Sequence, residues 1–322
     1  MLMKAYAAMG EGRAQFIELP VPEPAEDEAL VKIEGCVICN TTDQMVINMH
    51  FGAPGFPVVV GHESVGRVIK TGSKVKNLKP GDRVTRANAI PSGYNGEYYS
   101  AWGGFAEYGI VKDKPAVPGF GDLPLEKAGL LIALSETASC IMQLESIEGK
   151  DILVTGTGVS GLSLVYFSKK FGAGKVICTG RRAGRLELAK KLGADQVYLD
   201  GGTELAKAMA DGLSVDYVFE ATGKYDVFKD GIPMLKNNGS LIIYGVPEEP
   251  YVINEAKSPA VYSKMEFAPK EDMAYEYVCG LLQKDDLLGE IFMTHRWSFD
   301  ELDHALDLVR MGEVIKGMVV ME

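Results

Sequence analysis

Short apolar stretches alternate with amphipathic segments from about residue 150 onward. Ile152–Val154 is continuously apolar, and the pattern of Val159–Phe171 predicts a helix behind it. The alternation continues with a second predicted helix, Arg182–Leu192. Four further strands are predicted: Val176–Cys178, Gln196–Leu199, Asp216–Phe219 and Ser240–Tyr244. Strands and helices that alternate in this way predict βαβ units and a parallel sheet covered on both faces.

The first hundred residues follow a different pattern. Glu28–Glu34, Val65–Lys70 and Phe105–Val111 alternate apolar and polar side chains, and clusters of glycine and proline separate them. This pattern is typical of half-buried strands joined by loops, so we expect a β-rich first domain. Leu125–Glu145 is apolar on most faces and predicts a helix that leads into the α/β part.

The last part of the chain lies outside the α/β repeat. It predicts two helices, Asp272–Lys284 and Asp300–Met311, and a final strand, Gly317–Val320. A chain that ends in this way often returns to its first domain. We therefore expect residues 1–122 to form the first part of the β-rich domain, residues 123–265 the α/β domain, and residues 266–322 a C-terminal segment that completes the β-rich domain.

Composition excludes several classes of protein. The chain has 322 residues, 47% hydrophobic and 24% charged, and a formal net charge of −11, which is ordinary for a globular protein and unfavourable for unspecific binding to nucleic acid or an anionic membrane. The longest apolar runs fall well short of the ~20 residues that a membrane span needs. Charge appears too early for a secretory signal, and five scattered cysteines predict reduced thiols, so we expect a cytoplasmic protein.

A glycine-rich segment follows the first apolar strand of the α/β part and fits G-x-G-x-x-G. Its residues are Gly156, Thr157, Gly158, Val159, Ser160 and Gly161. Between a strand and a helix, this motif lets the backbone approach a pyrophosphate, whose charge lies at the helix N-terminus. The alternative is a tight strand–helix turn that binds no ligand.

The end of the second strand of the α/β part indicates which dinucleotide is bound. NAD-binding chains place a carboxylate there for the ribose hydroxyls, whereas this chain has Gly180, Arg181 and Arg182, with Arg185 one turn later. Guanidinium groups suit the geometry of a 2′-phosphate, so the sequence favours NADP(H) over NAD(H). The alternative is that these arginines are solvated charges at a helix start.

Cysteine and histidine residues of the first domain are candidate metal ligands. Cys39 with His62 and the adjacent Glu63 offers a thiolate, an imidazole and a carboxylate, a plausible set for Zn²⁺ with an open coordination position. Cys36 and Cys39 form a C-x-x-C pair that also suggests a redox site, although no thioredoxin-like context surrounds it.

Several motifs together resemble those of one family, the medium-chain, zinc-dependent alcohol and polyol dehydrogenases. The motifs are Gly61-His62-Glu63 with Gly66, Gly72 and Val75, then Gly81–Val84, Gly103–Tyr108 and Arg185–Asp195. The resemblance covers nearly the whole chain. It implies an α/β protein with a GroES-like β-rich catalytic domain and a Rossmann domain whose doubly wound parallel sheet binds the coenzyme.

The resemblance also implies roles for individual residues of the first domain. Cys39 and His62 match the first two zinc ligands, and Glu63 matches a neighbouring carboxylate that approaches the metal during ligand exchange. Thr41 matches the hydroxyl residue that passes the substrate proton outward. Cys36 matches a position that is usually not a ligand, which implies a packing role.

Further matches concern the coenzyme. Two segments are similar to those beside its ribose and nicotinamide: Ala221, Thr222 and Gly223, and Tyr244, Gly245 and Val246. Lys316 matches a basic position near the pyrophosphate.

The chain departs from the family pattern at three places. Ile132 replaces the third zinc ligand, and we expect Glu136, one helical turn later, to take that role with Glu63 as its substitute; the alternative is that Glu136 only lines the cleft. Thr42 replaces the acid that orients the zinc histidine, so Asp43 or a carbonyl must accept from His62. Residues 86–100 contain no cysteine, so we expect one catalytic zinc ion and no structural one.

The function expected from these features is hydride transfer between NADP(H) and a secondary alcohol or ketone, with zinc as Lewis acid. A polyol or sugar-type substrate is favoured by resemblance to the polyol branch of the family, and the family implies a homodimer or homotetramer. Two alternatives stay open: a metal-free quinone or enone reductase of the same fold, and a non-catalytic nucleotide-binding protein.

Overall fold

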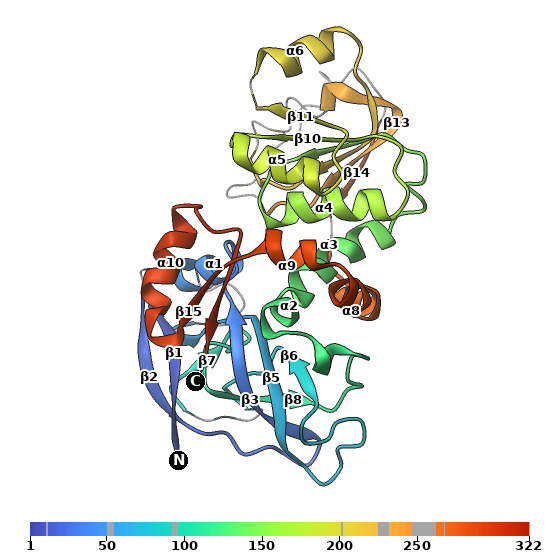
Figure 1. Cartoon of the computed structure of the whole chain (residues 1–322). Helices are drawn as coiled ribbons and strands as arrows, with labels where there is room; N and C mark the ends of the chain where they lie inside the picture. The colour runs from blue at the N-terminus through green and yellow to red at the C-terminus, as the bar shows by residue number, and fades with distance from the viewer. Residues whose placement is uncertain are drawn as a thin grey trace. The chain divides into compact units, whose positions relative to one another are not determined.

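The computed structural model describes residues 1–10, 12–49, 55–91, 94, 96–200, 202–224, 232–246, 262–266 and 268–321. The chain divides into two compact units (Figure 1). The first unit contains Met1–Ile132 and Tyr275–Glu322, and the second contains Ala133–Ala274. One unit is rich in β structure and the other is built on a parallel sheet, which confirms the predicted α/β class.

Two sheets form the frame of the first unit. One has the strand order β2-β1-β4-β7, and the other has the order β15-β16-β3-β5-β6, with β8 paired to β3. The strands are β1 (Leu2–Gly10), β2 (Arg13–Pro20), β3 (Glu28–Val37), β4 (Val58–Val59), β5 (Glu63–Thr71), β6 (Arg83–Thr85), β7 (Tyr99–Ser100), β8 (Tyr108–Lys112), β15 (Met293–Ser298) and β16 (Lys316–Val320). The strands predicted in this part of the sequence correspond to β3, β5, β8 and β16.

The two ends of the chain share this first unit. β16 pairs antiparallel with β3, where Met318 lies opposite Val37, and parallel with β15. The helices of the unit are α1 (Thr42–Met49), η1 (Phe120–Asp122), α2 (Leu125–Gly129), α8 (Tyr275–Lys284), α9 (Asp286–Phe292), η5 (Phe299–Glu301) and α10 (Leu302–Arg310). One hydrophobic core extends from Met3 near the start of the chain to Met321 near its end.

The second unit is built on a six-stranded sheet of order β11-β10-β9-β12-β13-β14, in which every pair of neighbours is parallel. Its strands are β9 (Ile152–Thr155), β10 (Val176–Gly180), β11 (Gln196–Leu199), β12 (Val215–Glu220), β13 (Leu235–Ile243) and β14 (Tyr262–Glu266). Its helices are α4 (Val159–Lys170), α5 (Ala183–Lys191), α6 (Thr203–Ala210), η2 (Ile232–Met234) and η4 (Glu271–Met273). The central strand β9 is fully buried, which explains why its sequence is continuously apolar.

The predicted helix over Leu125–Glu145 is wrong in one respect, because two helices occupy this range. α2 ends at Gly129, and α3 runs from Leu131 to Met142. The N–H of Leu130 donates to the carbonyl of Lys127 at 3.1 Å, a tighter turn than an α-helix makes. Several elements were not predicted: helices α1, α6 and α9, and strands β1, β2, β4, β6, β7, β14 and β15. Within the described residues, no helix has both the length and the apolar character that crossing a bilayer requires.

The buried centre of the parallel sheet should dominate the stability of the second unit. We expect Leu153→Ala in β9 to lower the free energy of unfolding of the second unit by about 3 kcal/mol, because the substitution leaves a cavity in a closely packed sheet. Leu199→Ala is the matched control, because Leu199 is 47% exposed at the end of the edge strand β11. Urea unfolding of both variants is the measurement, and equal losses would contradict this view of the core.

Candidate functional site

The pairing of β3 with β5 brings the candidate metal ligands together. Val37 at the end of β3 lies opposite Glu63 at the start of β5, so Cys39, two residues beyond β3, comes beside His62. Gly61 before His62 has a φ of 100°, and a Cβ atom there would lie 2.5 Å from the backbone nitrogen of Phe105. Only glycine fits this turn, which places the imidazole against the end of β3.

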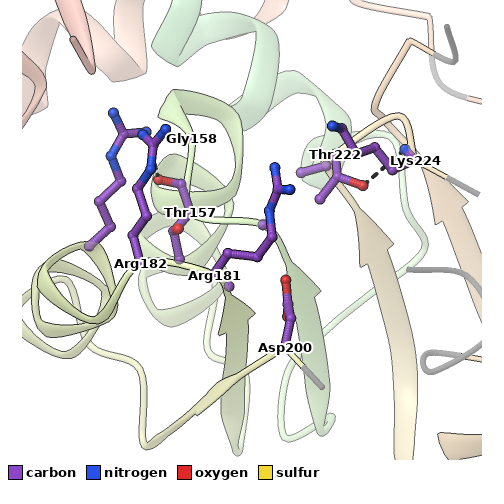
Figure 2. Close-up of a pocket in the computed structure, with 11 residues that line it drawn as sticks. Thr157, Gly158, Arg181, Arg182, Asp200, Thr222 and Lys224 are labelled. Atoms are coloured by element: carbon purple, nitrogen blue, oxygen red, sulfur yellow. Dashed lines mark hydrogen bonds between the residues drawn. The ribbon is translucent and has the colours of Figure 1, made fainter. Parts of the chain in front are cut away.

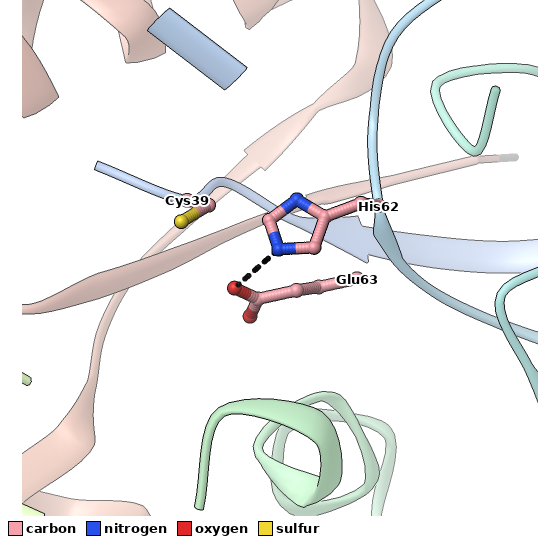
Figure 3. A group of neighbouring side chains, drawn as sticks. All are labelled: Cys39, His62 and Glu63. Carbon is pink, nitrogen blue, oxygen red and sulfur yellow. Dashed lines mark ion pairs between the residues drawn. The ribbon is translucent and has the colours of Figure 1, made fainter. Parts of the chain in front are cut away.

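Cys39, His62 and Glu63 form a compact group of donor atoms. One ligand atom from each residue lies within 4.8 Å of the other two (Figure 3). Within the described part of the chain, this is the one group of three or more histidine, cysteine or acidic residues close enough to hold a metal ion. Nε2 of His62 is 3.6 Å from Oε1 of Glu63, and both residues are buried. A sulfur, an imidazole nitrogen and a carboxylate oxygen are all ligands that Zn²⁺ accepts.

Asp43, the second residue of α1, fixes two members of this group. Its Oδ2 accepts the backbone N–H of Cys39 at 2.8 Å, and its Oδ1 lies 3.4 Å from Nδ1 of His62. Because Nδ1 faces Asp43, the other ring nitrogen of His62, Nε2, faces Glu63. Of the two acceptors that the sequence left open for the histidine, the structure contains the carboxylate of Asp43.

Glu63 and Lys316 form a buried ion pair, each with a side chain that is 1% exposed. Nζ of Lys316 lies 2.5 Å from Oε1 of Glu63 and 3.5 Å from the carbonyl of Ile38. The resemblance matches Lys316 to a basic position near the coenzyme pyrophosphate, and that role stays a prediction. Its ammonium is enclosed in the first unit, because the buried carboxylate of Glu63 requires a cation.

The charges around the donor group favour a cation. Burial by itself would lower the pKa of His62, but the sulfur of Cys39 and the carboxylate of Asp43 outweigh it and hold that pKa well above its usual range. Oε2 of Glu63 is buried without a hydrogen-bond partner. A divalent cation would satisfy this oxygen and the negative potential together, so the residues present fit a zinc ion.

The two cysteines of the C-x-x-C pair differ in burial, because Cys36 is buried and Cys39 is only partly buried. Burial raises the pKa of the Cys36 thiol well above its usual range, and the carboxylates of Asp43 and Glu63 raise it further. Cys36 is a free cysteine in β3 and lies outside the donor group. A thiol held protonated in this way is a poor metal ligand and a poor redox partner.

The remaining predicted residues of the metal site have different environments. Thr41 is exposed and immediately precedes α1. Ile132 is 1% exposed, and an aliphatic side chain offers no ligand atom. Glu136 lies on α3 within the second unit, so its role as a third ligand stays a prediction.

Two polar residues that follow Cys39 in the sequence were not singled out as site residues. Oδ1 of Asn40 and Nε2 of Gln44 are buried and have no hydrogen-bond partner. Leaving such atoms unpaired costs about 1–3 kcal/mol each, so a bound molecule or water is expected to satisfy them. Single asparagine and glutamine residues carry no sequence signal that distinguishes them from surface positions.

In the second unit, the glycine-rich segment connects β9 to α4. Gly156 has a φ of 103° and donates its N–H to the carbonyl of Thr179 at 2.8 Å. Gly158 precedes α4, no side chain caps this end of the helix, and a Cβ atom on Gly158 would meet nothing within 4 Å. The first N–H groups of α4 are therefore accessible to an anion, as the motif predicts.

A cavity of about 240 Å³ opens at this loop. Its lining contains nine of the predicted coenzyme residues: Gly156, Thr157, Gly158, Gly180, Arg181, Arg182, Arg185, Ala221 and Thr222. It does not contain Val159, Ser160 and Gly161, which lie in the first turn of α4, or Tyr244, Gly245 and Val246, which follow β13. Burial and the neighbouring Arg182 lower the pKa of Arg185, which shows how closely the cations crowd together.

Two charged residues of this cavity were missed from the sequence. Lys224 contributes a further cation, and Asp200 contributes the one carboxylate among the described residues of the lining (Figure 2). The N–H of Asp200 donates to the carbonyl of Gly180 at 3.1 Å, so the pairing of β11 with β10 places Asp200 beside the arginines. Basic side chains outnumber acidic ones among the lining residues that the structure describes, so the cavity suits an anionic ligand.

Comparisons with known proteins relate both parts of the chain to dehydrogenases. The family model described as alcohol dehydrogenase GroES-like domain matches residues 25–121, and the model described as zinc-binding dehydrogenase matches residues 160–264. The D-arabitol-phosphate dehydrogenase of Enterococcus avium is 29% identical over 337 residues, which cover 97% of this chain and 95% of that protein. The L-threonine 3-dehydrogenase of Mesorhizobium japonicum is 29% identical over 349 residues, and the match covers 100% of this chain and 99% of that protein.

A solved structure is also similar over its full length. It is a protein of Sinorhizobium meliloti 1021, described as a zinc-binding dehydrogenase bound to NADP, with 26% identity, coverage of 99% of both chains and a TM-score of 0.79. The similarity therefore extends over both units of the chain.

The buried pair of Glu63 and Lys316 gives a direct test of the site. We expect Lys316→Met to lower the free energy of unfolding of the metal-free protein by about 3–5 kcal/mol, because a buried carboxylate loses its cation. The double variant with Glu63→Gln should recover most of that loss. Urea unfolding in the presence of a chelator is the measurement. A loss below about 1 kcal/mol is typical of exposed ion pairs and would contradict the buried geometry.

Proposed function

The chain belongs to the zinc-dependent medium-chain dehydrogenase superfamily, and from this premise we propose that it is an oxidoreductase that interconverts a secondary alcohol and a ketone with NADP(H). The observation that carries the proposal is the group of Cys39, His62 and Glu63, whose ligand atoms lie within 4.8 Å of one another. This donor set leaves room for a substrate oxygen in a tetrahedral site.

The residues of the first unit would share the work as follows. Cys39, His62 and Glu63 hold the zinc ion, which when bound supplies a Lewis acid that lowers the pKa of the substrate hydroxyl. Asp43 holds the imidazole of His62 in the orientation that presents Nε2. The exposed hydroxyl of Thr41 accepts the proton that leaves the alcohol and passes it to solvent.

The cavity of the second unit supports NADP(H) as the coenzyme, which when bound would accept hydride as NADP⁺ or donate it as NADPH. Arg181, Arg182 and Arg185 line it at the end of β10, where a carboxylate would repel a 2′-phosphate, and Gly180 leaves that position without a side chain. Planar guanidinium groups form paired hydrogen bonds with phosphate oxygens. The related NADP-bound protein is consistent with this choice.

A polyhydroxy substrate is the class that we favour. Oδ1 of Asn40, the residue after Cys39, is an unpaired buried acceptor, and Nε2 of Gln44 on α1 is an unpaired buried donor. The hydroxyl groups of a polyhydroxy substrate can donate to the one and accept from the other. A related protein is named as a D-arabitol-phosphate dehydrogenase, which supports polyols, whereas another is named as a threonine dehydrogenase. Both names denote substrates with a secondary alcohol beside a polar group.

A metal-free quinone or enone reductase is the second candidate. The observation in its favour is Ile132, a buried aliphatic residue at the position where the family has a third ligand. Its fold and its dinucleotide cavity would be the same, so only the need for a metal separates the two functions.

The proposed activity is tested with NADP⁺ and a panel of polyols, polyol phosphates, simple secondary alcohols and L-threonine, with NADPH absorbance as the readout. We expect turnover that is lost on chelation and restored by Zn²⁺. Cys39→Ser should lower zinc content and reduce kcat/KM by about 100-fold, because it removes a ligand of the metal. Cys36→Ala is the matched control and should keep its zinc, because Cys36 lies outside the donor group. Equal rates after complete chelation would instead support the metal-free reductase.

The arginine cavity predicts the coenzyme preference. We expect the double variant Arg181→Ala and Arg182→Ala to raise KM for NADP⁺ at least about tenfold, because charge-assisted hydrogen bonds to the 2′-phosphate are lost. KM for NAD⁺ should stay nearly unchanged. Lys191→Ala, at the opposite end of α5, is the matched control. A strong preference of the parent enzyme for NAD⁺ would contradict the assignment.

A further inference from the structure

Glu220, the last residue of β12, carries a buried carboxylate in the second unit that the proposed chemistry does not use. Its side chain is 1% exposed, and three donors converge on Oε1. They are the N–H of Thr222 at 2.6 Å, the N–H of Gly223 at 3.0 Å and the hydroxyl of Thr222. A buried carboxylate requires such partners, so it forces the chain to turn sharply directly after the strand.

The turn held by Glu220 forms part of the coenzyme cavity. Ala221, Thr222 and Lys224 line that cavity, and the hydroxyl of Thr222 accepts the N–H of Lys224 at 3.0 Å (Figure 2). A continuous series of hydrogen bonds therefore runs from the buried carboxylate, through Thr222, to the backbone N–H of Lys224 at the cavity wall. The position of this wall depends on a side chain that is itself outside the lining.

Glu220 also holds the second segment that the resemblance places beside the coenzyme. Its backbone carbonyl accepts the N–H groups of Tyr244 and Gly245, each at 2.9 Å. A Cβ atom on Gly245 would lie 2.2 Å from the nitrogen of Gly223 and 2.7 Å from Oε2 of Glu220. The two segments therefore pack directly against each other, and Glu220 is bonded to both.

We propose that Glu220 is a positioning residue for the coenzyme, which fixes the segments after β12 and β13 before the dinucleotide binds. The inference rests on the proposed function, since it assigns a role within the same coenzyme site. A loop that is already ordered loses little conformational entropy on binding, and this raises affinity. Glu220 itself does not line the cavity, so its effect should lie in coenzyme binding and not in the chemical step.

The experiment compares Glu220→Met with Glu220→Gln in the zinc-loaded, full-length enzyme. Methionine fills similar space but accepts none of the three hydrogen bonds, whereas glutamine keeps one carbonyl oxygen for all of them. We expect Glu220→Met to raise the Kd of NADPH, measured by fluorescence titration, by about tenfold. Glu220→Gln should raise it by no more than about threefold, and kcat at saturating coenzyme should change by less than about twofold in both variants.

Asp216→Asn is the matched control, because Asp216 lies near the other end of the same strand. Its carboxylate accepts the backbone N–H of Asp151 at 2.8 Å, so this variant also loses a charged acceptor of a backbone hydrogen bond. We expect Asp216→Asn to lower Tm and to leave the Kd of NADPH unchanged. A general loss of stability would raise the Kd equally in Asp216→Asn and Glu220→Met, and that result would overturn the inference.

Two further results keep the test decisive. In Gly245→Ala, the added Cβ atom would clash with the nitrogen of Gly223 and with Oε2 of Glu220 in the same turn. This variant should also raise the Kd of NADPH at least about tenfold. If Glu220→Met does not fold, a parental Kd in Gly245→Ala would overturn the inference, and a Kd raised at least about tenfold would support it. Failure of the proposed function is a separate outcome: the parent enzyme would then bind neither NADPH nor NADH.

Discussion

The antiparallel pairing of β3 with β5 is the constraint on which the candidate metal site depends. The register that places Val37 opposite Glu63 brings a cysteine beyond one strand next to a histidine that precedes the other. Side chains alternate between the faces of a sheet, so a slip of one residue would turn Glu63 away from Lys316. The same hydrogen bonds therefore hold the sheet together and set the spacing of the donor atoms.

Burial of charge then determines what this site can bind. Asp43, His62, Glu63 and Lys316 are all buried, and each needs a partner because water does not reach it. Lys316 neutralises one carboxylate, while Asp43 and the sulfur of Cys39 leave a negative potential that holds the pKa of His62 high. A proton or a metal ion can satisfy that potential, and the three converging ligand atoms favour the metal.

The second unit uses buried charge in a similar way, for a different purpose. Glu220 at the end of β12 binds backbone N–H groups and shapes a loop, as Asp43 does at the start of α1. In both units a carboxylate at an element end fixes the backbone that carries or surrounds the functional groups. The glycine-rich segment after β9 differs from these two turns, because no side chain caps the start of α4 and the first N–H groups of that helix stay accessible to a ligand.

The sequence by itself determined the features that depend on neighbours along the chain. The apolar strand β9, the glycine loop and the start of α4 follow from local pattern, as do the strands β10, β11 and β12 and the adjacency of His62 to Glu63. Only the tertiary structure decided that Lys316, 253 positions away from Glu63, neutralises it, that Asp43 accepts from His62, and that Asp200 and Lys224 join the arginines. The physical reason is that hydrophobic period and turn chemistry act over a few residues, whereas the partner of a buried charge is chosen by whichever strand the fold brings beside it.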